Sequence, residues 1–227
     1  MIPLLAIAAL VAAYLSGSVN YAIIITRLVS GQDIRELGNH VAGASNTGRS
    51  IGRKWGLLVT FLDGMKAMGP LILARLFLFP EESDLHFAIL YGMALAAILG
   101  HMKPVFYNFR GGNGVASFQG AMLFFIPMEY LASMLIGGTI VLLFVRGVKY
   151  RLTQWVPISF VTLTPFLTLA INRIVDVPLF AHISIGGHLP AVIVGNFVLS
   201  LYMLGMNFAF MRERKRELLS QEKAGEE

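Results

Sequence analysis

The amino-acid sequence predicts an all-α, polytopic membrane protein with about seven transmembrane helices. Three observations support this fold class. Only 14% of the residues are charged, whereas soluble domains carry about a quarter. The mean hydropathy is +0.69, and apolar segments of roughly 20 residues, the length that crosses a bilayer as a helix, follow one another without a long polar linker. Basic residues gather in alternate loops between these segments.

Seven segments are expected to form the spanning helices, and two of them are short: 3–26, 56–79, 86–107, 115–127, 129–146, 155–172 and 188–211. The apolar run from 115 to 145 is too long for one span, and we divide it at Pro127 and Glu129. An alternative has five spans, with 115–127 re-entrant and one further segment not crossing. The sequence therefore predicts one membrane domain, 1–211, and a polar tail, 212–227.

The charges of the loops predict the orientation in the membrane. Basic loops and the basic tail fall on one side of the predicted spans, and the acidic loop 80–85 falls on the other. Cytoplasmic loops are enriched in Lys and Arg, so we expect the N-terminus outside and the C-terminus in the cytoplasm. The net charge of +5 fits contact with anionic membrane lipids, and we expect no nucleic acid as a partner.

Residues 110–114, RGGNG, form a candidate phosphate-binding loop. Glycines let neighbouring backbone N–H groups converge on one anion, and an arginine adds a permanent charge with the fork geometry that suits phosphate. The candidate binding residues are Arg110, Gly111, Gly112, Asn113 and Gly114. The alternative is a tight turn between two helices.

The segment 42–50, AGASNTGRS, is a second candidate anion site on the same predicted side. Ser45, Asn46 and Arg49 supply a hydroxyl, an amide and a guanidinium, which can all donate hydrogen bonds to an oxyanion. The alternative is a polar loop that caps the following helix. Two such loops on one face indicate a shared anionic ligand.

Three residues in or beside the predicted spans are candidates for a supporting role. Asp63 and Lys66 are spaced i,i+3, which places them on the same helix face, and charges inside a span are normally paired or functional. His101 lies at the predicted membrane interface before Pro104. The alternatives are an ion pair that only sets helix packing and a structural histidine. The chain has no cysteine, and its histidines show no metal-ligand spacing, so we expect no metal and no cofactor.

Four stretches together resemble the PlsY family of bacterial membrane acyltransferases: YLSGS at 14–18, GNHVAGASNTGRSIG at 38–52, FLDGMKAMGP at 61–70 and GHMKPVFYNFRGGNGVAS at 100–117. The residues that match the family motifs are Gly43, Ala44, Asn46, Arg49, Asp63, Lys66, Gly100, His101, Pro104, Val105, Phe106, Phe109, Gly111, Gly112, Gly114, Val115 and Ala116. The resemblance implies cytoplasmic substrate loops in the bacterial inner membrane and transfer of an acyl group from acyl-phosphate to glycerol 3-phosphate, giving lysophosphatidate.

The chain departs from the family pattern at several polar positions. Asn113 stands where the family has lysine, and Ser45 stands where threonine is usual. The family's serine before the sixth span and its C-terminal histidine and asparagine have no direct counterpart, and Arg212 and Arg214 lie near the last of these. These departures leave an alternative function, a catalytically impaired paralogue that binds a phosphorylated lipid or headgroup without acyl transfer.

Overall fold

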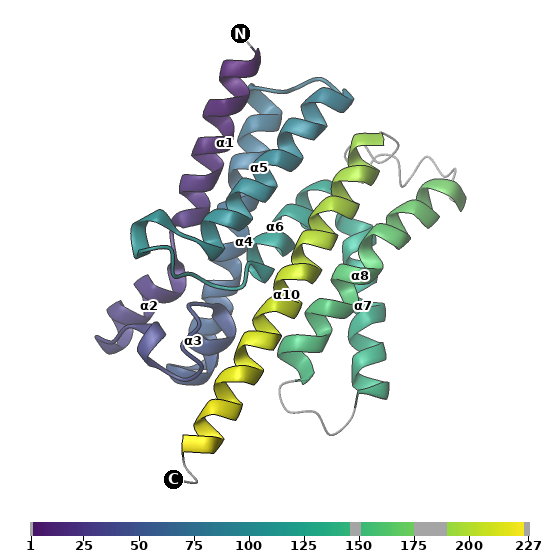
Figure 1. The fold of residues 1–227 in the computed structure, drawn as a ribbon. Coiled ribbons are helices and arrows are strands. Elements are labelled where there is room, and N and C mark those ends of the chain that lie inside the picture. Colours follow the sequence, from purple (N-terminus) through teal and green to yellow (C-terminus); the bar gives the residue numbers. More distant parts are fainter. Residues whose placement is uncertain (1, 146–150, 175–189, 225–227) are drawn as a thin grey trace.

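The computed structural model describes the backbone of residues 2–145, 151–174 and 190–224. It describes the surroundings of the side chains for residues 2–145, 155–171 and 190–212. The regular structure in these ranges is helical, which confirms the all-α prediction (Figure 1). The α-helices are α1 (Ile2–Ser18), α2 (Tyr21–Ser30), α3 (Ala44–Ser50), α4 (Arg53–Phe77), α5 (Asp84–Met102), α6 (Val115–Phe125), α7 (Pro127–Phe144), α8 (Arg151–Ile174) and α10 (Pro190–Ala224), and Ile34–Glu36 and Val105–Tyr107 are short 3-10 turns.

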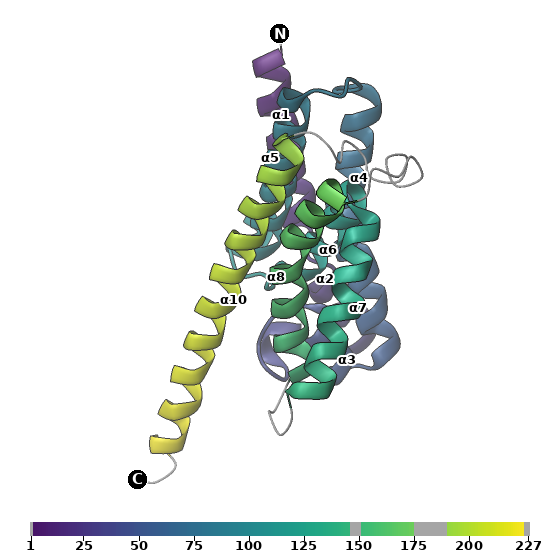
Figure 2. The same ribbon diagram turned by 90° about the vertical axis from the view of Figure 1, so that its right-hand side faces the viewer.

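The long helices run up and down the molecule in alternation, and the two termini lie at opposite ends (Figures 1 and 2). Within the described residues, five segments are long and apolar enough to cross a membrane. Helix α6 and the central part of α8 are apolar but shorter. Within the described residues each predicted segment is mainly helical, although not always as one continuous helix, while the number that crosses the bilayer, seven or five, stays a prediction.

The first predicted span, 3–26, is wrong as a single helix. The chain leaves α1 at Ser18 and begins α2 at Tyr21, because Asn20 is the N-cap of α2 and its side-chain oxygen accepts a hydrogen bond from Ile23 N. The Asn20 amide also donates to the carbonyl of Ala42 at 3.4 Å. The break therefore fastens α2 to the segment that leads into α3.

Two other predicted boundaries differ from the structure. Helix α5 ends at Met102 and not at residue 107, because Pro104 disfavours the helical conformation of the residue before it. Helix α10 continues past residue 211 to Ala224, so most of the predicted tail 212–227 prolongs the last helix. The predicted division of the run near Pro127 is confirmed, but Pro127 begins α7 and does not end the preceding span, and Glu129 lies within α7. A proline in the first turn of a helix costs nothing by its missing N–H. Part of the predicted basic loop 146–154 lies outside the described residues.

Glycines set how closely the helices around the core approach. A Cβ on Gly17 of α1 would overlap the backbone of Ala97 in α5, and one on Gly100 would overlap the carbonyl of Tyr14. Helices α4 and α6 cross in the same way, with Gly120 against the backbone of Gly64. Close contact through small residues is typical of helix pairs in membranes, where packing replaces the hydrophobic effect as the driving force.

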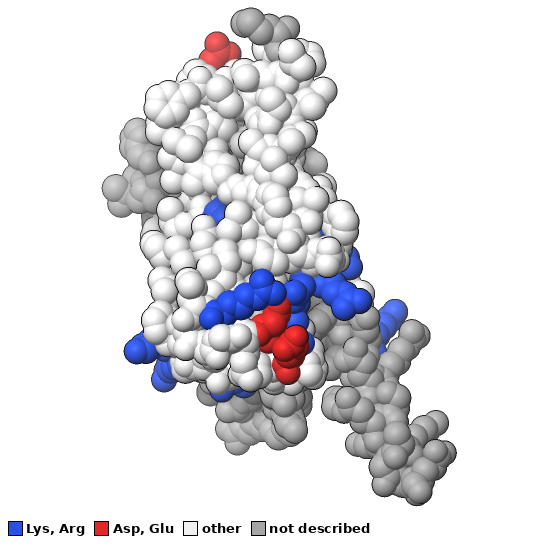
Figure 3. Space-filling model, turned by 90° about the vertical axis from the view of Figure 1, so that its left-hand side faces the viewer, with Lys and Arg blue, Asp and Glu red and all other residues white. Residues whose placement is uncertain are grey.

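Charge is distributed unevenly along the molecule. On the face drawn in Figure 3, most Lys and Arg side chains gather toward one end, with some acidic side chains among them. A largely uncharged surface separates this end from a small acidic group near the other end. Exposed apolar side chains on α1, α4 and α7 contribute to the uncharged surface of the molecule, for example Leu4, Leu76 and Leu135. This pattern fits a bundle that exposes its apolar flank to lipid.

Candidate anion-binding cavity

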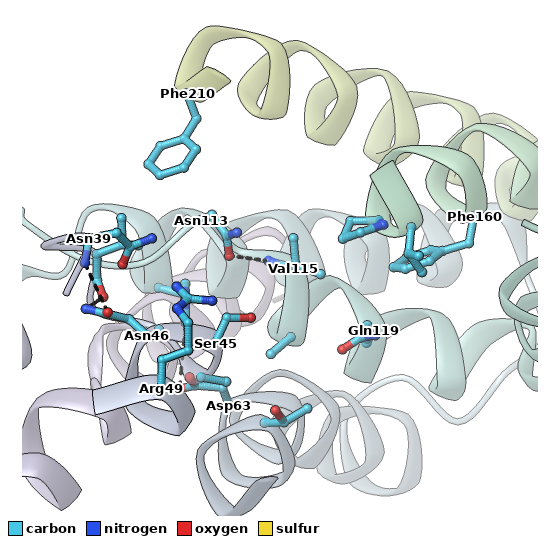
Figure 4. A pocket seen from close by; sticks show the side chains of 18 of the residues that line it. Asn39, Ser45, Asn46, Arg49, Asp63, Asn113, Val115, Gln119, Phe160 and Phe210 are labelled. Atoms are coloured by element: carbon cyan, nitrogen blue, oxygen red, sulfur yellow. Dashed lines mark hydrogen bonds and ion pairs between the residues drawn. The ribbon is translucent and has the colours of Figure 1, made fainter. Parts of the chain in front are cut away.

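A cavity of about 280 Å³ lies between the two loops that the sequence singles out (Figure 4). One part of its wall carries polar and charged side chains, which are Asn39, Ser45, Asn46, Arg49, Asp63, His101 and Asn113. The other part is mostly apolar and comes from α6, α7 and α8: Val115, Ala116, Met134, Val156, Pro157 and Phe160. The cavity therefore joins a polar region to an apolar one, as an amphiphilic ligand requires.

The first loop supplies its polar side chains from the short helix α3. Ser45 and Arg49 line the cavity, and Figure 4 shows their side chains directed toward the space below Asn113. Asn46 also lines the cavity, but its Nδ2 already donates to the carbonyls of Ile34 and Leu37 at 3.1 and 2.8 Å. A buried amide that is engaged in this way holds the shape of the preceding loop.

The second loop enters the cavity wall through Asn113, while its glycines serve the packing. Gly112 N donates to the carbonyl of His101 at 3.1 Å. A Cβ on Gly112 would overlap the His101 ring and approach the carbonyl of Ala42, so the two loops meet at this glycine. Gly114 has φ +81° and begins α6, a backbone conformation that favours glycine. Gly111, Gly112 and Gly114 do not line the cavity. These glycines instead allow the backbone to pack closely against residues 98–104 and Ala42.

Arg110 is not part of the cavity wall. Its side chain is exposed, and its backbone N–H closes a turn onto the carbonyl of Tyr107 at 3.2 Å. The turn directs the chain so that the arginine lies outside the cavity and Asn113 lies inside it. The sequence could not show this, because a five-residue loop gives no indication of which side chains face inward.

Asp63, Lys66 and His101 form a buried cluster beneath the loops. Lys66 Nζ lies 2.8 Å from Asp63 Oδ1 and donates to the carbonyl of Val19 at 2.6 Å. His101 Nδ1 lies 3.7 Å from the same Asp63 oxygen. Asp63 and His101 line the cavity, whereas Lys66 does not. The predicted helix-face pairing of Asp63 and Lys66 is confirmed, and His101 joins it from the end of α5.

Several cavity residues were not predicted, because nothing in the sequence distinguishes them. Thr60 and Gln119 are ordinary helical residues, and Phe160 and Phe210 lie far along the chain from both loops. In Figure 4, Phe210 of α10 lies above Asn39 and Asn113, and Gln119 and Phe160 lie at the other end of the cavity. Only the packing of α8 and α10 onto the first half of the chain brings these aromatic side chains to the site.

Comparison with known proteins leads to the same family that the sequence motifs resemble. The sequence profile of the family described as glycerol-3-phosphate acyltransferase matches residues 7–214. A glycerol-3-phosphate acyltransferase of Legionella pneumophila is 37% identical over 169 residues, which are 74% of this chain and 57% of that protein. One from Anaeromyxobacter is 40% identical over 121 residues, 53% of this chain and 59% of that protein. The chain thus spans somewhat over half the length of these curated relatives.

Two crystal structures share the fold over nearly the whole chain. PlsY (YgiH), described as an integral membrane glycerol 3-phosphate acyltransferase, matches in its glycerol 3-phosphate form with a TM-score of 0.63 and 28% identity, covering 95% of this chain and 92% of that one. Its lysophosphatidic acid form matches with a TM-score of 0.62 and 27% identity over the same shares. The all-helical architecture is that of a multi-pass membrane protein, and the chain belongs to the glycerol-3-phosphate acyltransferase family.

Proposed function

We propose that this protein is an acyl-phosphate:glycerol-3-phosphate acyltransferase that makes lysophosphatidate for bacterial phospholipid synthesis. We place it in the inner membrane, with its N-terminus outside and its C-terminus in the cytoplasm. The observation that carries the proposal is the single cavity that joins Arg49, Ser45 and Asn113 to an apolar wall. Family membership and the two forms of the PlsY structure support it.

The proposed reaction is a direct acyl transfer. The 1-hydroxyl oxygen of glycerol 3-phosphate attacks the acyl carbonyl carbon, the new ester bond forms, and the bond between that carbon and the phosphate oxygen breaks. The hydroxyl proton leaves with the inorganic phosphate. No metal or cofactor takes part in this scheme, because phosphate is already a good leaving group.

The cavity residues contribute by binding and orienting the two substrates. Arg49 provides a fixed cation for a phosphate, and Ser45, Asn39 and Asn113 provide hydrogen-bond donors around it. The apolar wall at Met134 and Phe160 accommodates the acyl chain. Orientation and stabilisation of oxyanion charge account for large rate factors without a covalent intermediate.

The test is to give the purified protein palmitoyl phosphate and glycerol 3-phosphate and to measure phosphate and lysophosphatidate. We expect both products in equal amounts and a loss of about 100-fold or more in kcat/KM for Arg49→Ala. Arg53→Ala is the matched control, because Arg53 begins α4 beside α3 but does not line the cavity. Phosphate release no higher than without protein, where PlsY turns over in parallel, would overturn the proposal.

The same assay separates this function from the impaired paralogue that the departures from the family pattern suggest. The relatives described above carry the acyltransferase name, which favours the enzyme. An inactive wild type that still binds glycerol 3-phosphate, together with activity in Asn113→Lys, would instead support a chain that has lost catalysis.

A further inference from the structure

The turn that leads into the second loop contains Phe109, a residue type that rarely adopts the conformation it has there. Asn108 and Phe109 have φ values of +54° and +57°, and Arg110 N closes the turn onto the Tyr107 carbonyl at 3.2 Å. Two successive positive φ values with this hydrogen bond make a turn in which glycine is normally preferred. The left-handed conformation is costly for a bulky side chain such as Phe109. The surrounding structure must therefore hold this turn in place.

Residues 31–41 continue directly into 42–50 and belong to the same loop, the first loop, and Arg35 holds the turn from there. Its Nη1 donates to the Tyr107 carbonyl at 3.2 Å, the same oxygen that closes the turn. Its Nε and Nη2 donate to the two carboxylate oxygens of Asp33 at 3.0 and 2.8 Å. The Asp33 side chain is only 10% exposed and also receives Arg27 Nη2 at 2.7 Å. A bidentate pair of this kind fixes the plane of the Arg35 guanidinium and hence the direction of its third contact.

The backbone of Arg35 contacts a second left-handed residue, which belongs to the first loop. His40 has φ +62°, and its Nδ1 lies 3.0 Å from the Arg35 carbonyl oxygen. His40 directly follows Asn39, which lines the cavity. Arg35 therefore lies between two left-handed corners, one just before each stretch that forms the cavity wall, although it does not line the cavity itself.

We propose that Arg35 is a positioning residue for acyl transfer: through Asp33, the Tyr107 carbonyl and His40 it sets the spacing between the loop that carries Ser45 and Arg49 and the loop that carries Asn113. The proposal rests on the proposed function for its kinetic consequence. Its geometric consequence is independent of activity. Without Arg35 the turn at Asn108 and Phe109 relaxes, and Asn113 moves relative to Arg49.

The kinetic test compares Arg35→Ala with Arg27→Ala, which also removes a partner of Asp33 but has no contact with Tyr107. We expect Arg35→Ala to lower kcat about 10- to 100-fold, since small misplacements of reacting groups have effects of this size. Arg27→Ala should stay within about two-fold of the wild type. Arg35→Lys should fall between them, because an ammonium cannot hold Asp33 bidentately and reach Tyr107 as well.

Relief of the strained turn gives a sharper test. Glycine adopts positive φ without the steric cost, so Phe109→Gly should restore most of the activity lost in Arg35→Ala and change the otherwise wild-type protein little. A general loss of stability would not be repaired in this way. The proposal is overturned if Arg35→Ala keeps full kcat, or if Phe109→Gly leaves the double variant as impaired as the single one.

A distance measurement keeps the proposal testable if the proposed function itself fails. Because the chain has no cysteine, spin labels can be attached at Glu36→Cys and Arg110→Cys, both exposed and one on each loop. We expect a narrow distance distribution that broadens in Arg35→Ala but not in Arg27→Ala. An unchanged distribution in Arg35→Ala would refute the positioning role, whether or not the wild type releases phosphate.

Discussion

At the scale of single residues, Gly112 has the most demanding position in the site. A methyl group there would overlap the His101 ring and crowd the Ala42 carbonyl, so Gly112→Ala must push the two loops apart. We expect kcat/KM to fall about 100-fold, because misplaced binding groups lose orientation. Gly69→Ala is the control, since a Cβ at Gly69 meets nothing within 4 Å. Equal activity of the two variants in the phosphate-release assay would contradict this account.

The buried pair of Asp63 and Lys66 predicts a strongly coupled double-mutant cycle. Either Asp63→Asn or Lys66→Met leaves one charge buried without its opposite, a change that costs about 3–5 kcal/mol of stability. The double variant removes both charges and should be more stable than the sum of the single effects indicates. Equilibrium unfolding in detergent measures all four proteins. Costs that simply add would show that the two side chains do not stabilise each other.

Asp33, in the segment between α2 and α3, is expected to make the stability of the folded protein depend on pH. Hydrogen bonds from the Arg35 guanidinium, opposed by partial burial and aided by Arg27, hold the pKa of Asp33 well below its ordinary value of 3.8. A depressed pKa in the folded state adds stability that is fully present above the unfolded-state pKa and is lost as the pH falls below it. We expect the melting-temperature difference between wild type and Asp33→Asn to be constant from pH 7 to about pH 5 and to shrink below about pH 4. A difference that shrinks already above pH 5 would assign the effect to another group.

At this scale the sequence indicated the chemistry of the site better than its geometry. Ser45, Arg49 and Asn113 line the cavity as expected, and Asp63 and His101 lie beside them. Arg110 was predicted to bind phosphate and lies outside, because the direction of a side chain in a loop depends on a turn that its residue types disfavour. Asn39 was not among the predicted site residues, although it lines the same wall.

At the scale of helices, the contact between α7 and α8 predicts that alanine substitutions at two neighbouring glycines differ in their effect on stability. A Cβ on Gly137 would meet Ser159 Oγ at 2.7 Å and Phe160 N at 3.0 Å, whereas one on Gly138 meets nothing within 4 Å. We expect Gly137→Ala to destabilise the protein by about 1–3 kcal/mol, because it overpacks a helix contact. Gly138→Ala should be neutral or slightly stabilising, since alanine favours a helix. Thermal unfolding of the two variants checks this, and equal melting temperatures would contradict the observed crossing.

Helix positions follow from hydrophobic length, and helix breaks follow from local hydrogen bonds. Apart from 3–26, which is divided between α1 and α2, each predicted span corresponds to one helix, because about 20 apolar residues have no other stable form in lipid. The break at Asn20 was missed, since it depends on a side-chain cap to Ile23 N that the apolar pattern does not encode. The early end of α5 could have been predicted from Pro104, which the sequence shows plainly.

At the scale of the whole molecule, the uneven charge predicts which end faces the cytoplasm. The cysteine-free chain allows single cysteines at Glu82, in the acidic turn after α4, and at Lys54, near the start of α4. We expect a membrane-impermeant maleimide to label Glu82→Cys in intact cells and Lys54→Cys only after permeabilisation, because basic segments stay in the cytoplasm. The reverse pattern would invert the proposed orientation.

The helix pairing in the bundle was beyond the reach of the sequence. Helix α1 packs on α5, and α4 packs on α6, through glycines that resemble the many others in the chain until their neighbours are known. The same pairing brings residues 42–50 and 110–114 together at Gly112 and places Phe160 and Phe210 around them. Residues of both loops line one cavity because of tertiary packing, which periodicity and composition do not specify.

The position of the Asp63–Lys66 pair within one helix also bears on how the protein is made. Since the two side chains are one turn apart, α4 can neutralise its own charges as soon as it coils, before any other helix arrives. The Val19 carbonyl becomes a partner of Lys66 only after α1 has docked. The middle of a nascent α4 can therefore enter lipid with its two central charges already paired, and assembly of the bundle then places Asp63 of this pair in the wall of the cavity.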